Sequence, residues 1–454
     1  MKKFIRIATL MLALITALML CSCEFQLEDI YEADIATLRE AIQSGELSCH
    51  DLTQYYLDRI EKYNKDYNCF ITMCDDALEI ADKRDKALAK GKGDGLLFGI
   101  PVVIKDNMDY KGYETTNGHE KGSSYIATEN SYVVQRLLDE GAIILGKTNM
   151  ATDAETAINS FSDAVGDTKN AYNKECSPGG SSGGTAVAVS LNFAAAGLGT
   201  DTNSSLRIPA AFNGDVALRS TYDLIDRTGI VELNSTRDVV GAITRSVADQ
   251  AIMMDVLVGD NYEAYEHLKN IDKKMLEGKK IGVIKELSDR KYIEEDGFEV
   301  DEEAYKLFEN AKKELEKMGA ELVEVSLPVY EYHELCWDTN NSYYRDEYKE
   351  IFDETMDAEG LYVMIYPDCP TSEMYLDEPE TMDFFDTCKY IAPIIGVPDI
   401  TVQIGNLESD VGVGMGILAR EGRDQSALAV AYLYSTTFNH RVAPAGAPNL
   451  TKSK

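Results

Sequence analysis

The sequence predicts an α/β fold in which helices cover the faces of a sheet. Short apolar runs of strand length alternate with segments of helical periodicity between residues 35 and 326, and this alternation is typical of α/β proteins. The 454-residue chain contains 44% hydrophobic and 27% charged residues, as globular proteins do. A chain of this length can bury a large core, either as one large domain or as two ordinary ones.

The elements are expected in a regular order. The first helix is Ile35–Ser44, which has apolar residues at helical spacing and stops at Gly45, a residue typical of helix C-termini. Ser48, with Asp51 three residues later, resembles a capping pair and opens a second helix that ends near residue 63. The later strands are expected at residues 69–74, 97–105, 142–148, 194–200, 280–284 and 321–326, and the later helices at residues 75–90, 131–139, 185–191, 246–257 and 301–318.

Two serine clusters and one lysine suggest a hydrolytic site. Residues 177–186 read SPGGSSGGTA, residues 199–209 read GTDTNSSLRIP, and Lys105 ends the apolar run in GIPVVIKDN at residues 99–107. A serine hydroxyl is a poor nucleophile until a base takes its proton. Lysine can be that base when desolvation lowers its pKa, as it does beside an apolar strand. Glycine-rich turns let backbone N–H groups approach a developing oxyanion.

Five segments carry a resemblance to the amidase signature family: residues 146–150, 177–186, 199–209, 229–249 and 391–399. The resemblance covers the chain from about residue 35 to the C-terminus. It implies a single large α/β/α domain with a mixed, twisted sheet. It also implies an amidase, which hydrolyses an amide carbon–nitrogen bond to a carboxylic acid and an amine or ammonia.

The resemblance implies a role for each member of the serine and lysine set. Lys105 is the base. Ser181, held in a cis peptide, relays the proton. Ser205 is the nucleophile that forms the acyl-enzyme, which water then hydrolyses. The oxyanion hole consists of four backbone N–H groups, those of Thr202, Asn203, Ser204 and Ser205. Three neighbours are expected to support the site: Asp201, Arg207 and Ser182.

The nucleophile loop departs from the family pattern. Asn203 and Ser204 stand where the family usually has two glycines, and Asp223 stands where a glycine is common. If positions 203 and 204 require a positive φ, asparagine tolerates it better than serine does. Ala171 and Ser220 replace two usual prolines. None of these changes removes a catalytic side chain, and they bear on substrate range and turnover.

The N-terminus has the pattern of a targeting signal. Three basic residues, Lys2, Lys3 and Arg6, precede the apolar residues 7–20, a run shorter than the roughly 20 residues that a membrane span needs. The following Leu-Cys-Ser-Cys ends at Cys23 and resembles a bacterial lipoprotein box. We expect a signal peptide at residues 1–22 and a lipid on Cys23, with an ordinary secretory signal as the alternative.

This pattern predicts the domain order and the location of the protein. Residues 23–34 form an acidic tether, and residues 35–454 form the amidase domain. The protein is expected to be exported and anchored to the outer face of the bacterial membrane by its lipid alone. Seven cysteines remain after Cys21 and Cys23, an odd number, which outside the cytoplasm leaves at least one free thiol or an intermolecular bond.

The composition limits the kinds of partner that the protein is expected to bind. The chain has 44 Lys and Arg against 78 Asp and Glu, a formal net charge of −34, which argues against nucleic acid because phosphate contacts need Lys and Arg. No cysteine or histidine group has zinc-ligand spacing, and we expect neither a metal nor a cofactor. The expected partner is a small-molecule or peptide amide. None of the five histidines lies in a motif suited to a Ser-His-Asp triad.

Two other functions stay open. One is a catalytically impaired amidase-like lipoprotein that binds amides or peptides, which the changes at Asn203 and Ser204 allow. The other is an amidotransferase A-type subunit, which shares these motifs and supplies ammonia to a tRNA-linked substrate; the exported N-terminus and the acidity argue against it. Residues 330–382 contain many Tyr, Asp and Glu. In the family this region lines the substrate entrance, and helix packing under an acidic surface is the equal alternative.

Overall fold

The structure is a computed structural model that describes residues 25–259, 262–295, 300–337, 342–368, 375–377 and 390–450. The expected signal peptide (residues 1–22) and Cys23 lie outside these ranges. Among the helices described, none combines the length and the apolar character that a membrane crossing needs.

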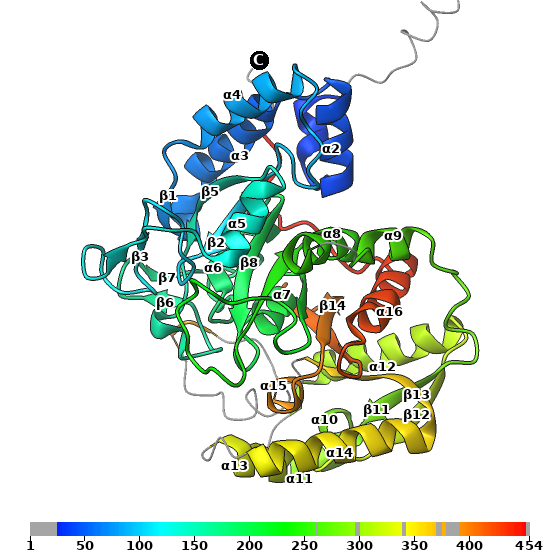
Figure 1. Ribbon diagram of the computed structural model, residues 1–454. Helices are drawn as coiled ribbons and strands as arrows, with labels where there is room; N and C mark the ends of the chain where they lie inside the picture. Colours follow the sequence, from blue (N-terminus) through cyan, green and yellow to red (C-terminus); the bar gives the residue numbers. More distant parts are fainter. Residues whose placement is uncertain are drawn as a thin grey trace, which may run out of the picture.

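The fold is built on a mixed sheet of 11 strands (Figure 1). From one edge to the other these are β1 (Phe70–Met73), β5 (Ile143–Thr148), β2 (Pro101–Lys105), β8 (Ala196–Asp201), β10 (Val239–Thr244), β9 (Val216–Arg219), β14 (Asp399–Asn406), β15 (Gly412–Leu418), β13 (Leu361–Pro367), β11 (Lys280–Ile284) and β12 (Glu321–Val325). Strand β2 runs parallel to β5 and β8, and β11 runs parallel to β12 and β13. The other neighbours are antiparallel. The predicted mixed sheet is confirmed.

Helices and two small hairpins complete the described chain. The hairpins are β3 (Glu114–Thr115) with β4 (Tyr125–Ile126) and β6 (Phe161–Ser162) with β7 (Gly166–Asp167). The α-helices are α2 (Ile35–Ser44), α3 (Cys49–Tyr63), α4 (Ala77–Leu88), α5 (Tyr132–Asp139), α6 (Gly183–Ser190), α7 (Arg207–Phe212), α8 (Val247–Val258), α9 (Ala264–Lys269), α10 (Lys285–Ser288), α11 (Arg290–Glu295), α12 (Glu302–Lys317), α13 (Val329–Trp337), α14 (Ser342–Glu359), α15 (Ile391–Ile395) and α16 (Asp424–Thr437). Short 3₁₀ turns are η1 (Leu27–Ile30), η2 (Asn64–Asp66) and η3 (Thr152–Ala154).

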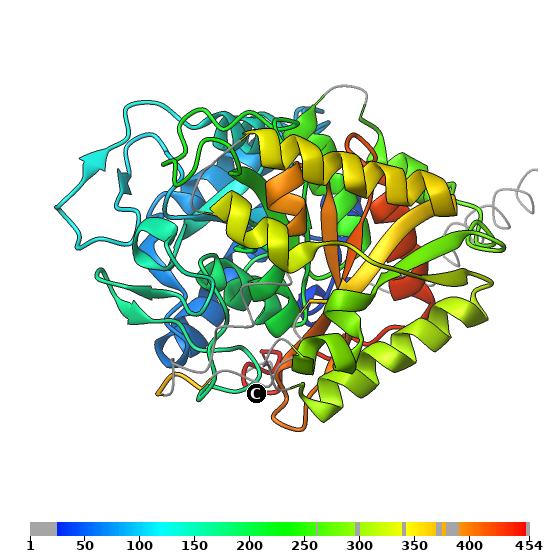
Figure 2. The ribbon, with the colours of Figure 1, turned by 90° about the horizontal axis from the view of Figure 1, so that it is seen from below.

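Helices pack on both faces of the sheet, as strand β13 shows. Val363 and Ile365 belong to the core cluster that contains residues of α12 and α16. Met364 and Tyr366, which point to the opposite face, belong to the cluster that contains residues of α14 and α15. Figure 2 shows α13 and α14 lying across this second face. The described residues of the tyrosine-rich region 330–382 therefore pack as helices and a strand.

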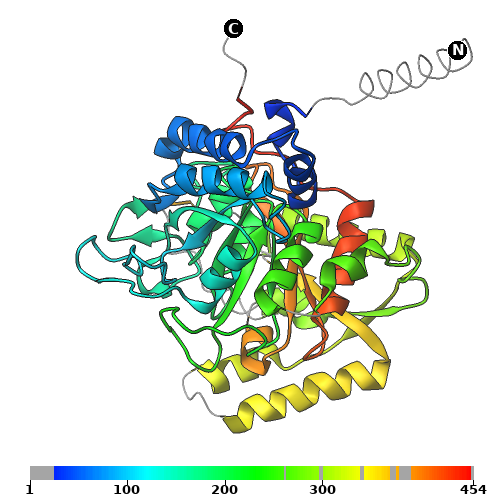
Figure 3. The same ribbon diagram turned by 45° about the horizontal axis from the view of Figure 1, so that its top comes forward.

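The two ends of the described chain lie side by side on the molecule (Figure 3). The Asn449 side chain accepts a hydrogen bond from the Tyr55 hydroxyl at 2.7 Å and donates one to the Glu28 carbonyl at 2.9 Å. The domain expected at residues 35–454 thus also contacts residues of the expected tether.

Small residues bring helix α6 directly onto strand β8. A Cβ added at Gly197 would lie 2.5 Å from Cγ2 of Thr185, and one added at Gly199 would lie 2.8 Å from Cβ of Ser182. Larger side chains would push the helix away from the strand. The glycines therefore hold the serine loop that precedes α6 against the end of β8.

Candidate active site

Lys105 lies at the end of β2 and is completely buried. Its Nζ donates hydrogen bonds to Oγ of Ser181 at 2.7 Å and to Oγ1 of Thr200 at 2.9 Å. Burial lowers the pKa of Lys105 from 10.5 to about 7, although Asp238 and Asp201 act in the opposite direction. A large share of this amine is thus neutral near pH 7 and able to accept a proton.

Ser181 follows a cis peptide bond between Gly180 and Ser181, as the resemblance implies. Its neighbour Ser182 joins the two serine clusters. The Ser182 hydroxyl donates to the Thr200 carbonyl at 3.2 Å, and the Ser182 amide donates to the Ser205 carbonyl at 3.3 Å. These bonds fix the backbone of one serine cluster against that of the other.

Ser205 lies in the loop between β8 and α7 and is 5% exposed. It lines a small cavity of about 80 Å³ together with Thr202 and Asn203. No described residue accepts a hydrogen bond from the amides of residues 203–205, so these N–H groups are available to an oxyanion. Neither Asn203 nor Ser204 has a positive φ, whereas Asp223 has a φ of 61°. The positive φ considered for positions 203 and 204 therefore does not occur there, although it does occur at Asp223, where the family commonly has a glycine.

The side chains that replace the two family glycines have no described partners. The Asn203 Oδ1 atom and the Ser204 hydroxyl are both buried without a hydrogen bond to any described residue. Asn203 faces the small cavity, while Ser204 is completely buried. The first replacement narrows the space around Ser205, and the second lies outside that cavity's lining.

A buried ionic network lies under the nucleophile loop. Arg207 contacts Asp201 at 3.0 Å and Asp399 at 2.6 Å, and Arg219 contacts Asp201 at 3.0 Å. Arg207 also donates to the carbonyl of Asn203 at 3.2 Å. Burial opposes ionisation of Asp201, but the two guanidinium groups outweigh it and hold the pKa of this carboxyl below its usual range. The ionic contacts of Asp201 and Arg207 thus hold the loop in place.

Three further polar residues belong to this site and were missed in the sequence. Thr200 accepts hydrogen bonds from Lys105 and, at 3.1 Å, from Asn107. Asp238 accepts a hydrogen bond from the Thr202 hydroxyl at 2.6 Å. Thr200 and Asn107 lie at or just beyond the ends of adjacent strands, where parallel strands bring polar residues together. Polar residues at the ends of predicted parallel strands are the sequence signal by which Thr200 and Asn107 could have been predicted.

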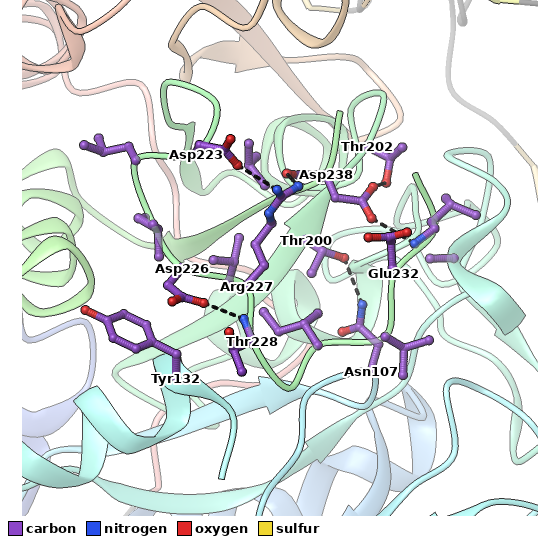
Figure 4. Close-up of a pocket in the computed structure, with 18 residues that line it drawn as sticks. Asn107, Tyr132, Thr200, Thr202, Asp223, Asp226, Arg227, Thr228, Glu232 and Asp238 are labelled. Carbon is purple, nitrogen blue, oxygen red and sulfur yellow. Dashed lines mark hydrogen bonds and ion pairs between the residues drawn. The ribbon is translucent and has the colours of Figure 1, made fainter. Parts of the chain in front are cut away.

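A wider cavity of about 590 Å³ adjoins the small one (Figure 4). The two cavities share three lining residues, Ala154, Thr202 and Leu233. Asn107 and Thr200 also face the wide cavity. One end of the wide cavity therefore lies beside Thr200, which accepts a hydrogen bond from Lys105, and beside the loop that carries Ser205. Within the described ranges, no group of three or more His, Cys, Asp or Glu side chains could hold a metal ion.

Comparison with known proteins identifies the family. The family profile described as Amidase matches residues 51–337. The chain belongs to the amidase signature family. The A-type subunit of the glutamyl-tRNA(Gln) amidotransferase from Thermoanaerobacter pseudethanolicus is 36% identical over 315 residues, which cover 67% of this chain and 62% of that protein. This amidase-family chain thus aligns with less than two thirds of that relative.

Two solved structures share the fold over nearly their full lengths. PAM12A has a TM-score of 0.79 and 26% identity, covering 92% of this chain and 99% of its own. The peptide amidase of Stenotrophomonas maltophilia has a TM-score of 0.78 and 25% identity, with the same coverage. The chain is therefore an amidase signature enzyme, either an amide hydrolase or similar to the amidotransferase protein.

Proposed function

We propose that this enzyme is an amidase that hydrolyses a linear amide to a carboxylic acid and an amine or ammonia through an acyl-enzyme on Ser205. The observation that carries this proposal is the 2.7 Å hydrogen bond between Lys105 and Ser181. It joins a lysine whose pKa is lowered to about 7 to the serine loop, and Ser182 joins that loop to the backbone of Ser205.

The proposed reaction moves one proton along the polar chain. Neutral Lys105 takes the proton of Ser181, Ser181 takes that of Ser205, and Ser205 Oγ attacks the amide carbonyl. The amides of residues 202–205 stabilise the oxyanion of the tetrahedral intermediate. The proton returns by the same route to the leaving nitrogen as the carbon–nitrogen bond breaks. Water then attacks the ester, and Ser205 is released.

An amidotransferase A-type activity is the second candidate. Its support is the 36% identity to the glutamyl-tRNA(Gln) amidotransferase protein of Thermoanaerobacter pseudethanolicus. The same three side chains would release ammonia from an amide donor. The net charge of −34 makes direct binding of tRNA by this chain unfavourable. The solved structure of a peptide amidase, which this chain matches over 92% of its length, favours simple hydrolysis.

Activity profiling separates these functions. The purified protein is incubated with a library of amides, with and without hydroxylamine as an alternative acyl acceptor, and both the acid and the amine are quantified. Without hydroxylamine we expect equal amounts of acid and amine from the wild type and neither product from Ser205→Ala. With hydroxylamine, part of the acyl group should leave Ser205 as a hydroxamic acid, so that acid and hydroxamic acid together equal the amine. Binding without turnover by both proteins would instead support the amide-binding function. Product formation that requires a partner protein would support the amidotransferase.

We further propose that the enzyme is an exported lipoprotein, with residues 1–22 removed and Cys23 carrying the lipid. The support is the order of basic residues, apolar run and cysteine at the N-terminus. Expression in a bacterial host with a tagged fatty acid tests this. We expect the label on the wild type and its absence from Cys23→Ser. An unlabelled wild type released into the medium would indicate an ordinary secretory signal.

A further inference from the structure

The wide cavity next to Ser205 has an acidic lining. Four carboxylates face it, those of Asp223, Asp226, Glu232 and Asp238, and Arg227 is the one cation in the described lining. Figure 4 shows these side chains around the space, with Asn107 and Thr200 among them. The charge of a ligand that fits here depends on which of these groups remain free.

Arg227 is already engaged by the protein. Its Nη2 contacts Asp223 Oδ1 at 2.7 Å, and its Nη1 donates to the Asp238 carbonyl at 2.6 Å. Its guanidinium also lies 4.8 Å from the centre of the Tyr222 ring. The cation of the lining is therefore neutralised by Asp223, and it offers little to an anionic substrate.

Asp238 is also occupied by internal bonds. One carboxylate oxygen accepts from the Thr202 hydroxyl, and the other accepts from the amides of Leu233 and Asn234 at 2.8 and 2.9 Å. This carboxylate shapes the loop at residues 233–234. Two acids remain that can contact a ligand.

The two available acids are Glu232 and Asp226, and both are exposed. Among the described residues none pairs with the Glu232 carboxylate. Asp226 accepts a hydrogen bond from the Thr228 amide at 2.7 Å, and hydrogen bonding by the side chain and backbone of Thr228 lowers the pKa of this carboxyl. Each of these two carboxylates has oxygen atoms to offer to an ammonium group.

Asn107 supplies a second, independent indication of the ligand. This side chain is 2% exposed and faces the cavity. Its Nδ2 donates to Thr200, while its Oδ1 is buried and accepts from no described residue. A buried acceptor without a donor is destabilising, so a ligand N–H placed here would be stabilising. The cavity therefore offers acceptors at its inner end as well as negative charge along its lining.

We infer that the wide cavity binds an amide substrate that carries a protonated amine. The carboxylates of Glu232 and Asp226 attract the ammonium group, and a substrate N–H donates to Asn107 Oδ1. The apolar part of the lining, which includes Ile225, Ile230 and Val231, contacts the alkyl or aryl spacer between the ammonium and the reacting amide. This inference rests on the proposed hydrolysis at Ser205 and names the substrate class of that site.

The test compares p-nitroanilides whose acyl chains are equal in length and end in an ammonium, a hydroxyl or a carboxylate. We expect kcat/KM to be highest for the ammonium and lowest for the carboxylate. Glu232→Gln and Asp226→Asn should each reduce the ammonium-to-hydroxyl ratio of kcat/KM by up to about fivefold, the range of exposed ion pairs. Glu324→Gln, an exposed charge change on edge strand β12, should leave this ratio unchanged.

Two further measurements distinguish a failure of the proposed hydrolysis from a failure of the inferred ammonium preference. A neutral fluorophosphonate tests Ser205 regardless of substrate charge, so the absence of labelling would count against the proposed hydrolysis alone. Calorimetry on Ser205→Ala measures binding of the ammonium and hydroxyl anilides without turnover. Tighter binding of the ammonium supports the inference, with a preference that weakens at high salt. Equal affinities, or an ammonium preference that survives both acid substitutions, would overturn it.

Discussion

Replacing Lys105 by methionine should abolish activity and stabilise the protein. Burial lowers the pKa of this lysine from 10.5 to about 7, and a shift of this size corresponds to about 5 kcal/mol against the folded state at low pH. Methionine has similar length and no charge. In this variant the hydroxyls of Ser181 and Thr200 lose the hydrogen bonds that Lys105 donates. This loss costs about 1–3 kcal/mol of stability. The variant should therefore be more stable than the wild type by about 2 kcal/mol or more at pH 7.

The sign of the pH dependence follows from the same shift. Below about pH 7 the buried lysine is protonated in both states, and the penalty is complete. Between about pH 7 and 10.5 the unfolded chain holds a proton that the folded chain lacks, so stability rises with pH in this window. In the difference between wild type and Lys105→Met the contributions of other groups cancel. This difference should shrink as the pH increases from 7 to 9.5.

Denaturant unfolding of both proteins at the two pH values measures these differences. Lys147→Met is the matched contrast, because Lys147 is also buried but contacts Asp106 at 3.2 Å. Its removal leaves a buried carboxylate unpaired and should destabilise the protein by about 3–5 kcal/mol. A folded Lys105→Met protein that is less stable than the wild type at pH 7 would refute the reasoning, since a desolvated lysine could not then be present.

Further predictions concern the residues around Lys105. Ser181→Ala should lower kcat/KM by about 10²–10⁴ with the fold intact by circular dichroism, because the proton relay is interrupted. Thr200→Val removes a hydroxyl that Lys105 contacts at 2.9 Å, and an unchanged pH–rate profile in this variant would show that Thr200 does not position the lysine. Asp201→Asn should destabilise the protein by about 3 kcal/mol in denaturant unfolding, because buried Arg219 loses its anionic partner and buried Arg207 keeps only Asp399. Asn203→Gly should widen the cavity at Ser205 and extend the range of amides cleaved in the library assay; an identical substrate range would show that Asn203 does not restrict entry.

The part of the fold near the serine clusters could be predicted because its strands are buried on both faces. Strand β2 at Pro101–Lys105 and strand β5 at Ile143–Thr148 are entirely buried, and such strands form continuous apolar runs in the sequence. The expected strand at residues 97–105 begins only at Pro101, because the backbone turns at Gly99, which has a φ of 75°. The sequence therefore predicted the type of this element correctly but not its first residue.

The strands expected at residues 280–284 and 321–326 are present as β11 and β12, but the strands between β8 and β11 in the sheet order could not be predicted from the same signals. Strand β15 (Gly412–Leu418) alternates glycine with apolar residues, and glycine weakens a strand signal. These glycines are explained only by contacts: a Cβ at Gly416 would lie 2.4 Å from the Tyr366 ring. Strand β10 (Val239–Thr244) contains Gly241, which packs against Leu218. Such close approaches depend on neighbours that are distant in the sequence.

The residues of the site also differ in how far the sequence predicts them. Lys105, Ser181 and Ser205 stand in ordered motifs, and the structure brings Lys105 and Ser181 into direct contact. The pairing of Arg207 with Asp399 joins residues separated by 192 positions, which a single sequence does not reveal. The catalytic roles themselves stay predictions until they are measured.

The most direct test of the central claim is the rate at which a neutral fluorophosphonate labels Ser205 as a function of pH. Wild-type labelling should rise with pH around a midpoint near 7, the pKa to which burial lowers Lys105. In Lys105→Met the rate should be at least about 100-fold lower and should not show this midpoint. Labelling of Lys105→Met at the wild-type rate, or attachment of the probe to a residue other than Ser205, would contradict the account.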